Sequence, residues 1–287
     1  MTKAPKKQKK EVKTTGHSWD GIEELNNPLP RWWLWTFYGC IVFALVYMAA
    51  YPAIPLLKEA TPGFLGWSTR QDVAKDIKKF DDANKALEEK LVATDLTQVS
   101  EDAELYHYAT SAGAAVFRTW CIQCHGSGGQ GAKGFPNLLD DDWLWGGDVE
   151  TIYTTVTHGI RSSADDDTRT GEMPAWADVL EPDETKSVIE YVLKLSGQDA
   201  DQQLAEAGAI VFEDNCAACH GDDGTGDRDL GAPNLTDAIW LYGGDRATIT
   251  ETVTKGRHGV MPNWNARLND ADIRSVTLYV HQLGGGE

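Results

Sequence analysis

The sequence predicts a mainly α-helical protein in which one N-terminal transmembrane helix precedes two tandem domains of a single fold. An uncharged run near the N-terminus is long enough to cross a bilayer, and the later part of the chain repeats one pattern twice. Strand-like alternation of apolar and polar residues is absent, so a sheet is not expected. The expected boundaries are 1–30 for an N-terminal tail, 31–57 for the transmembrane helix, 58–100 for a charged linker, 101–198 for the first domain and 199–287 for the second.

Charge is distributed unevenly along the 287 residues. Residues 1–57 hold seven basic and four acidic side chains, a net charge of +3, so the rest must carry −21 to give the total of −18. An acidic body of this strength repels phosphates and attracts basic proteins. Nucleic-acid binding is therefore not expected, whereas a basic protein partner is.

The transmembrane helix is predicted from 26 uncharged residues, Trp32 to Leu57. About 20 apolar residues cross a bilayer as a helix, and tryptophans near the start and tyrosines further on suit the two interfaces. Pro52 and Pro55 should end the regular helix near Tyr51. A cleaved signal peptide is the alternative, but this run is longer than the usual apolar region of about 7–15 residues.

Positive charge determines the expected orientation of this helix. Six lysines among the first 13 residues, and Arg31 at the membrane edge, place the N-terminus in the cytoplasm of a bacterial cell. Everything after Lys58 is then exported to the periplasm. Cys40, inside the span, is interpreted as a lipid-facing or helix-packing residue.

Residues 68–100 are rich in charge, and their apolar positions are sparse. This pattern indicates an exposed helical arm that joins the membrane segment to the following domains. We expect this arm to carry no site of its own.

The second half of the chain is a diverged copy of the first. Landmarks recur in the same order with small insertions between them, which indicates two domains of one fold. The paired landmarks are Gly113–Phe117 and Gly208–Phe212, Cys121–His125 and Cys216–His220, Pro136–Leu138 and Pro233–Leu235, Trp143–Gly147 and Trp240–Gly244, and Met173–Trp176 and Met261–Trp264. Each copy is expected to contain a helix before the cysteines, a glycine-rich loop, a short middle helix and a last amphipathic helix. The glycines Gly113 and Gly208 suit a close crossing of the first and last helices.

Both copies contain Cys-x-x-Cys-His, the sequence that attaches haem c. The two thiols lie about one helical turn apart and can form thioethers with the two vinyl groups of a haem, while the histidine is held under the iron. The residues are Cys121, Cys124 and His125 in the first copy and Cys216, Cys219 and His220 in the second. The expected cofactors are two covalently bound haem c groups, in two domains of the class I cytochrome c type.

The second axial ligand of each iron is predicted to be methionine. Of the four methionines, Met1 and Met48 lie before the repeats, whereas Met173 and Met261 occupy matching places in them. Methionine opposite histidine raises the reduction potential and leaves no vacancy for oxygen or peroxide. The alternative is that both methionines fill a core. With both irons closed, the chain would pass electrons without itself catalysing a reaction.

Four further residues have two interpretations each. Trp143 and Trp240 are candidates to donate a hydrogen bond to a haem propionate, or to fill the core. His158 and His258 have no counterpart in the other repeat and are interpreted as surface or haem-edge residues, with iron ligation as the alternative. Residues 161–170 interrupt only the first copy, and this acidic segment is expected to be an exposed loop or a docking loop for a basic partner.

Together these motifs resemble the membrane-anchored dihaem cytochrome c subunit, subunit III, of cbb3-type cytochrome c oxidases. The resemblance covers nearly the whole chain, and its most specific part is DGIEELNNPLPRWW, residues 20–33. It implies a subunit of a proton-pumping terminal oxidase in the bacterial inner membrane. Such a subunit accepts electrons from cytochrome c donors and passes them towards a monohaem subunit and the haem–copper subunit that reduces oxygen. It also implies the ligand pairs His125 with Met173 and His220 with Met261.

Three other functions are compatible with haem attachment. A free-standing membrane dihaem cytochrome would serve another respiratory or denitrification complex, and co-purifying haem b and copper would distinguish the oxidase subunit from it. A dihaem peroxidase-like enzyme needs one open iron, whereas both repeats offer a methionine. A haem gas sensor needs an output domain, which the sequence does not indicate.

Overall fold

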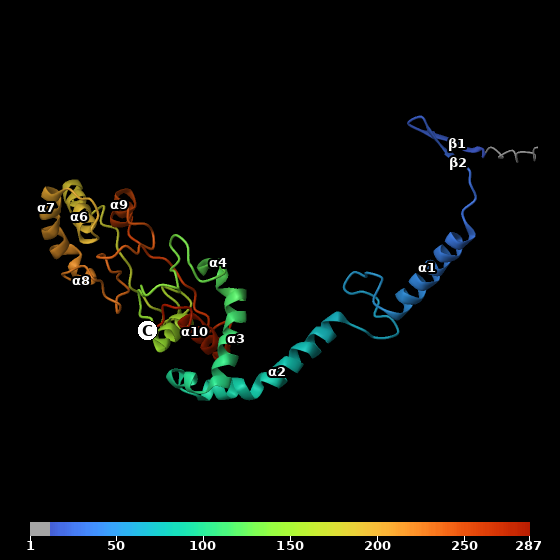
Figure 1. Ribbon diagram of the computed structural model, residues 1–287, viewed down its shortest axis with the longest axis horizontal. Coiled ribbons are helices and arrows are strands. Elements are labelled where there is room, and N and C mark those ends of the chain that lie inside the picture. Colours follow the sequence, from blue (N-terminus) through green and yellow to red (C-terminus); the bar gives the residue numbers. More distant parts are fainter. Residues whose placement is uncertain (1–11) are drawn as a thin grey trace, which may run out of the picture. The chain divides into compact units, whose positions relative to one another are not determined.

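The computed structural model describes residues 12–287 and is mainly helical (Figure 1). The chain divides into two units that meet between Asp82 and Ala83. The predicted fold class is confirmed, because the first unit contains a helix long and apolar enough to cross a membrane and the second contains helical domains. The lysines at positions 3, 6, 7, 9 and 10, which support the predicted orientation, lie outside the described residues.

The first unit begins with a β-hairpin that the sequence pattern did not predict. Strand β1, Thr14–Trp19, pairs antiparallel with strand β2, Ile22–Leu25. The two-residue turn between them consists of Asp20 and Gly21, whose φ angles are 49° and 82°. An Asp-Gly turn with positive φ at both residues favours a hairpin because its twist matches that of the strands. The expectation that the chain forms no sheet is therefore wrong for residues 14–25.

Helix α1, Arg31–Ala50, is the candidate membrane span. Its 20 residues rise about 30 Å at 1.5 Å each, which matches the hydrocarbon thickness of a bilayer. The helix ends just before Tyr51 and Pro52, as predicted, so the expected boundary at 57 lies beyond the helix itself. The backbone amides of Phe64 and Leu65 donate hydrogen bonds to carbonyl oxygens in the last turn of α1.

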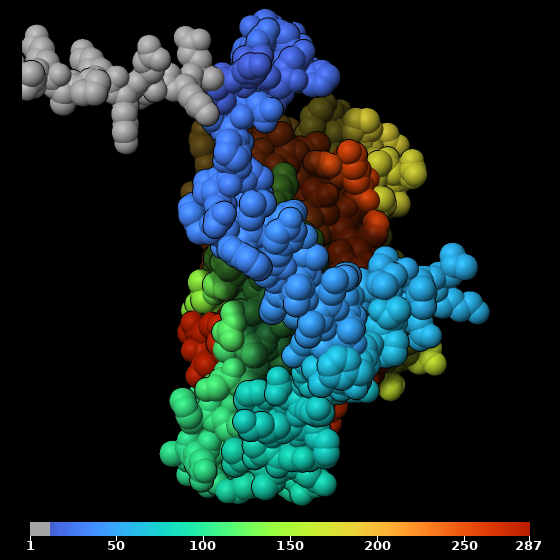
Figure 2. All heavy atoms as spheres, turned by 90° about the vertical axis from the view of Figure 1, so that its right-hand side faces the viewer, coloured from blue at the N-terminus to red at the C-terminus, as the bar shows by residue number. Residues whose placement is uncertain are grey.

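Helix α2, Thr69–Ala93, forms the predicted arm, but its C-terminal end is not merely solvated. Leu91 is fully buried, together with Val99 of the 3-10 helix η1, Leu96–Glu101. Both pack in one core cluster with Leu105 at the start of the next helix. Figure 2 shows this junction, where the end of α2 (cyan) lies against the following helix (green). The last part of the arm therefore belongs to the core of the second unit.

The second unit contains the two repeats, each with four helices. The first repeat forms α3 (Ala103–Trp120), α4 (Ile122–His125), α5 (Val149–His158) and α6 (Pro182–Leu195). The second repeat forms α7 (Gln202–Asn215), α8 (Ala217–His220), α9 (Arg246–Lys255) and α10 (Asp270–His281). These positions agree with the predicted helices to within a few residues.

The first and last helices cross closely, but each pair combines helices from different repeats. Helix α3 packs on α10, and α6 packs on α7, as Figure 1 shows. Phe117 of α3 meets Tyr279 of α10 with ring centroids 5.4 Å apart, and Phe212 of α7 meets Tyr191 of α6 at 5.2 Å. The repeats have therefore exchanged their last helices.

Two hydrophobic cores result from this exchange. The core of globule A contains residues from α3, α5 and α10, and α4 packs against it through Ile122. The core of globule B contains residues from α6, α7 and α9, and α8 packs against it through Ala217. The predicted division into 101–198 and 199–287 therefore describes the sequence repeat and not the packed bodies.

Two backbone pairings hold the segments where the chain passes between the globules. The amide of Ile160 donates to the carbonyl oxygen of Met261 at 2.9 Å, and the amide of Met261 donates back at 3.0 Å. Met173 and Arg257 exchange the equivalent two hydrogen bonds, both at 3.0 Å. Each methionine segment is thus paired with the segment that follows the middle helix of the other repeat.

The 161–170 segment packs against the second repeat. Ser162 is buried, and its hydroxyl donates to Asn263 Oδ1 at 2.9 Å. Asp165 accepts a hydrogen bond from Asn265 Nδ2 at 2.6 Å and lies 3.1 Å from His158 Nδ1. These bonds tie the insertion to the segment after Met261, while five of its residues are exposed as expected: 163, 164, 166, 167 and 170.

The exchange of helices predicts a specific pattern of energetic coupling. In double-mutant cycles, alanine substitutions at Phe117 and Tyr279 should be coupled by about 0.5–1.5 kcal/mol in the free energy of unfolding, because the two rings touch. Phe117 and Tyr191 form the matched control and should be coupled by less than about 0.5 kcal/mol, since they lie in different globules. Denaturant unfolding of the purified protein measures both. A larger coupling for the control pair would mean that each repeat packs within itself.

Candidate functional site

The two Cys-x-x-Cys-His segments have the same backbone structure. Each continues the preceding long helix by one short turn, α4 after α3 and α8 after α7. The amide of His125 donates to the carbonyl oxygen of Cys121 at 2.9 Å, and that of His220 to Cys216 at 2.9 Å. This single helical turn holds the two cysteines and the histidine of each motif together, as attachment of one flat group requires.

A glycine ends each of these turns. Gly126 and Gly221 follow the histidines with φ angles of 78° and 77°, a region that L-residues with a side chain rarely adopt. The chain then folds back, and the carbonyl oxygens of His125 and His220 each accept a backbone hydrogen bond at 2.8 Å. The glycine-rich loops noted in the sequence thus form a tight turn directly after the histidine of each motif.

Both motif histidines are oriented by a proline carbonyl. His125 Nδ1 lies 3.1 Å from Pro136 O, and His220 Nδ1 lies 3.2 Å from Pro233 O. Since a carbonyl oxygen only accepts, Nδ1 carries the proton and Nε2 keeps its lone pair. A histidine held in this tautomer can bind a metal through Nε2, and the second hydrogen bond fixes the ring. Burial also lowers the pKa of both rings, which favours the neutral form needed for ligation.

The four motif cysteines are free thiols in the structure. Cys121 and Cys216 are half-buried, whereas Cys124 and Cys219 are exposed. Burial, followed by the neighbouring cysteine of the same motif, raises the pKa of Cys121 and of Cys216 to about 11. Such thiols remain protonated near neutral pH and are not poised as thiolate nucleophiles. Attachment of a cofactor agrees with this environment better than dithiol redox chemistry does.

A cavity of about 620 Å³ in the second unit contains the second motif. Its wall includes Cys216, Cys219 and His220 from the end of α7 and from α8. Met173, from the first repeat, lies on the same wall, as does Trp240. Apolar side chains of α6, α7 and α9 complete it; they are Val188, Val192, Phe212, Ile249 and Val253. This combination fits a large apolar group that is held by two thioethers and by nitrogen and sulfur ligands.

Met261 lies in the corresponding place in globule A. It packs against the core that contains Phe117, with Cys121 and Trp143 packed against the same core. The carbonyl oxygen of Met261 would lie 2.4 Å from a Cβ added at Gly159, and that of Met173 would lie 2.4 Å from one at Gly256. The two methionine segments are therefore positioned by the same close backbone approach.

The placement of the two methionines bears on the ligand pairs implied by the resemblance. Met173 lines the same cavity as His220, and Met261 packs against the same core as Cys121. The pairing of His125 with Met173 and of His220 with Met261 therefore stays a prediction, and the observed placement favours the crossed pairs. The physical reason is the helix exchange, because each methionine precedes the last helix of its repeat and moves with that helix into the other globule.

The two tryptophans differ in their hydrogen bonding. The indole N–H of Trp143 donates to the carbonyl oxygen of Gly285, so it is not free to donate to a propionate. Within residues 12–287, the Trp240 indole N–H has no hydrogen-bond acceptor, and its ring lines the cavity with Met173 and His220. A contact with a propionate therefore remains a prediction for Trp240 and is not supported for Trp143.

The remaining histidines of the repeats do not line the cavity around His220, although His258 lies between two residues that do, Arg257 and Gly259. His158 is half-buried and bound to Asp165, while His258 and His107 are exposed. His281 Nε2 lies 2.9 Å from the carbonyl oxygen of Glu287. The motif histidines and the two methionines therefore stay the predicted axial ligands.

Comparison with known proteins agrees with these features. The family model described as N-terminal domain of cytochrome oxidase-cbb3, FixP, matches residues 11–58. The model described as cytochrome c oxidase, cbb3-type, subunit III, matches residues 109–192 and again 203–280. The first match contains the hairpin and α1, and the second covers the two repeats in turn.

Several curated proteins are similar over nearly the whole chain. The cbb3-type cytochrome c oxidase subunit CcoP of Cereibacter sphaeroides is 64% identical over 100% of both chains. The subunit of the same name from Rhodobacter capsulatus is 59% identical, again over 100% of both. The cbb3-type cytochrome c oxidase subunit FixPc of Rhizobium leguminosarum bv. viciae is 50% identical over 96% of both.

Asp142 lies on the cavity wall with other acidic residues near it. Burial, with smaller contributions from Asp237 and Asp140, raises the pKa of Asp142 to about 6. When the pKa of a carboxyl is higher in the folded state than in the unfolded chain, the free energy of unfolding of the protein falls as pH rises. For Asp142 that loss falls between about pH 4 and pH 6 and is complete above this range.

Asp142→Asn should therefore remove the dependence of stability on pH in this range. It should also raise the free energy of unfolding at pH 7 by about 1 kcal/mol, a small value because solvent screens the half-exposed side chain. Asp141→Asn, at an exposed neighbour, is the control and should leave the profile unchanged. The effect is measured as denaturant midpoints from about pH 3.5 to about pH 8. This range spans the pKa of Asp142 in the unfolded chain and in the folded protein. Equal slopes in the wild type and Asp142→Asn would contradict the assignment.

Proposed function

The chain belongs to the family of subunit III of cbb3-type cytochrome c oxidases, and we propose that it carries two covalently bound haem c groups and passes electrons between them. The observation that carries this proposal is the paired construction of the site. Two Cys-x-x-Cys-His turns have one backbone structure, and each has its histidine oriented by a proline carbonyl. Haem supplies the one-electron chemistry, and the protein supplies attachment, ligands and burial.

The proposed ligands are His125 with Met261 for one iron and His220 with Met173 for the other. The shared cavity of His220 and Met173, and the shared core of Cys121 and Met261, support these crossed pairs. A histidine nitrogen and a thioether sulfur together close both axial positions, so neither iron keeps a vacancy for oxygen or peroxide. The chain would then relay electrons without catalysing oxygen reduction itself, as closed irons require.

The partners follow from the family. Relatives are named as subunits of the cbb3 oxidase. We propose that electrons enter from a basic cytochrome c donor, attracted by the acidic body, and leave towards the monohaem and the haem–copper subunits. Helix α1 would anchor the chain in the inner membrane with the N-terminus in the cytoplasm and the haem domains in the periplasm.

Methionine substitutions test both the ligands and their crossing. Met173→Ala and Met261→Ala should each convert one of two low-spin haems to a high-spin form, since each change removes one sulfur ligand. Absorption spectra of the reduced and oxidised protein measure the conversion. Met48→Ala, in the membrane span, is the control and should leave both haems low-spin. A methionine variant whose two haems both stay low-spin would contradict that ligand.

Nuclear magnetic resonance distinguishes the crossed pairs from pairs within one repeat. In the reduced protein, the methyl group of a ligating methionine is shifted strongly upfield and lies close to its own haem. Met261→Leu should remove the methyl signal that has contacts to the haem attached at Cys121 and Cys124. Loss of contacts to the haem attached at Cys216 and Cys219 would instead mean that each repeat supplies its own methionine.

A further inference from the structure

Two arginine–aromatic pairs occupy equivalent positions where globules A and B meet. The guanidinium carbon of Arg169 lies 5.1 Å from the ring centroid of Trp145, and that of Arg257 lies 4.3 Å from the ring centroid of Tyr242. Trp145 and Tyr242 are matching residues of the repeated Trp-Leu-x-Gly-Gly landmark. Arg169 and Arg257 each stand four residues before the predicted methionine ligand. The same feature has thus been kept in both repeats.

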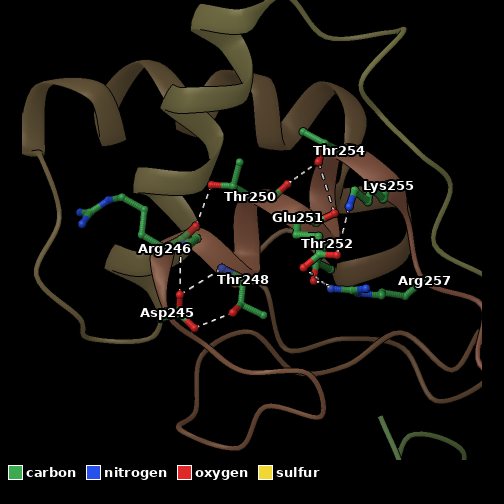
Figure 3. Close-up of polar contacts among 10 residues, drawn as sticks. Asp245, Arg246, Thr248, Thr250, Glu251, Thr252, Thr254, Lys255 and Arg257 are labelled. Atoms are coloured by element: carbon green, nitrogen blue, oxygen red, sulfur yellow. Dashed lines mark hydrogen bonds and ion pairs between the residues drawn. The ribbon is translucent and has the colours of Figure 1, made fainter. Parts of the chain in front are cut away.

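A threonine holds each arginine in the same way. Arg169 Nε donates to Thr155 Oγ1 at 3.1 Å, and Arg257 Nε donates to Thr252 Oγ1 at 3.1 Å. Figure 3 shows Arg257 beside Thr252 at the end of α9. Both threonines lie in the last turn or two of the middle helix. Because these bonds use only Nε, the four N–H groups on the two terminal nitrogens of each arginine remain available to a planar acceptor such as a carboxylate.

Neither arginine is closely paired with a carboxylate of the chain. Within residues 12–287, no carboxylate oxygen lies within 4.0 Å of Arg169, and the nearest to Arg257 is that of Glu251 at 3.9 Å. Both side chains are half-buried, and burial lowers the pKa of Arg169. A guanidinium stays charged even so, and removing a charge from water is costly unless an opposite charge meets it. Among residues 12–287, Arg169 thus has no carboxylate within ion-pair distance and Arg257 has only Glu251 at 3.9 Å, although the protein carries an excess of 18 negative charges.

Each arginine adjoins one of the two sites. Arg257 lines the cavity that contains His220, and its backbone pairs with that of Met173. The amide of Arg169 donates to the carbonyl oxygen of Gly159, next to Ile160, which pairs with Met261. The other charged residues on the cavity wall are Lys133, Asp140, Asp142, Arg161 and Glu172. None of these three acids lies within ion-pair distance of Arg257. The Arg257 guanidinium therefore lines a space in which the carboxylate of a bound group can pair with it.

We propose that Arg257 binds a propionate carboxylate of the haem attached at Cys216 and Cys219, and that Arg169 does the same for the haem attached at Cys121 and Cys124. A haem carries two propionates, which supply the anionic, planar groups that the arginines lack. The aromatic ring fixes the plane of each guanidinium, and the threonine fixes its direction. This inference rests on the proposed attachment of two haems.

The test is redox titration of the intact, haem-loaded protein. Each arginine stabilises the electron-rich reduced haem by compensating a propionate. Arg257→Gln should therefore lower the midpoint potential of one haem by about 59 mV, which corresponds to a tenfold change in its ratio of reduced to oxidised form. Arg169→Gln should lower the potential of the other haem to a similar extent, and the double variant should lower both.

Resonance Raman spectroscopy provides a second readout, because propionate bending modes respond to hydrogen bonding. These modes should shift in Arg257→Gln and shift less in Arg257→Lys, which keeps the charge but loses the planar fork. Lys186→Gln is the control: it removes an exposed cation of α6 that is paired with Asp183 at 2.9 Å, and it should move neither potential.

The outcomes separate this inference from the proposed function. Low-spin spectra with unchanged potentials and unchanged propionate modes in both glutamine variants would overturn the inference and leave haem ligation intact. A shift of equal size in Lys186→Gln would also overturn it, since a general charge effect would then suffice. If Arg257→Gln or Arg169→Gln fails to load haem, the lysine variant at the same position is measured instead. Propionate modes that are the same in the lysine variant and the wild type would overturn the inference. Absence of two haems in the wild type would instead contradict the proposed function.

Discussion

The close crossing of helices from different repeats is the contact on which the second unit depends. A Cβ added at Gly113 would lie 2.0 Å from the carbonyl oxygen of Ser275, and one at Gly208 would lie 1.9 Å from that of Ser187. Only glycine lets the two backbones approach so closely without displacing one of them. The crossing assigns α10 to α3 and α6 to α7, and each last helix brings with it the methionine segment that precedes it. The composition of both candidate sites follows from these two contacts.

Exchange of the last helices also links the two globules mechanically. All the helices of globule B lie between α5 and α10 in the sequence, so globule B is inserted into globule A. The chain passes between them twice, and the pairings of Ile160 with Met261 and of Met173 with Arg257 hold both passages. Moving one globule relative to the other would break these bonds and disturb both methionines. Since electron transfer slows steeply with distance, an arrangement that holds the two candidate sites in place suits the proposed relay.

The sequence predicted the parts of the site well, but not their assembly. The Cys-x-x-Cys-His turns, the glycines after them and the two methionines could be located because each depends on neighbours within a few residues. The globule in which each methionine packs could not, because both repeats carry the same landmarks and local contacts would be similar in either arrangement. The hairpin at residues 14–25 was overlooked although Asp20 and Gly21 are a strong turn signal, since its strands are too short to show alternation. The burial of Leu91 depends on long-range packing that a charged, sparsely apolar pattern does not reveal.

The connections between helices decide whether the last helices are exchanged, because the contacts that recur in both repeats do not distinguish the exchanged from the unexchanged arrangement. Only six residues, 196–201, join α6 to α7, and short links between helices favour antiparallel neighbours. Buried Glu190 of α6 secures this link by accepting a hydrogen bond from the amide of Asp201 at 2.8 Å and two from Arg246 of α9. Packing α6 on α3 instead would separate α6 from α9 and remove the two hydrogen bonds that Arg246 donates to the Glu190 carboxylate. The link and its carboxylate therefore bias the chain towards the exchanged form, in which each methionine packs in the globule that holds the cysteine motif of the other repeat.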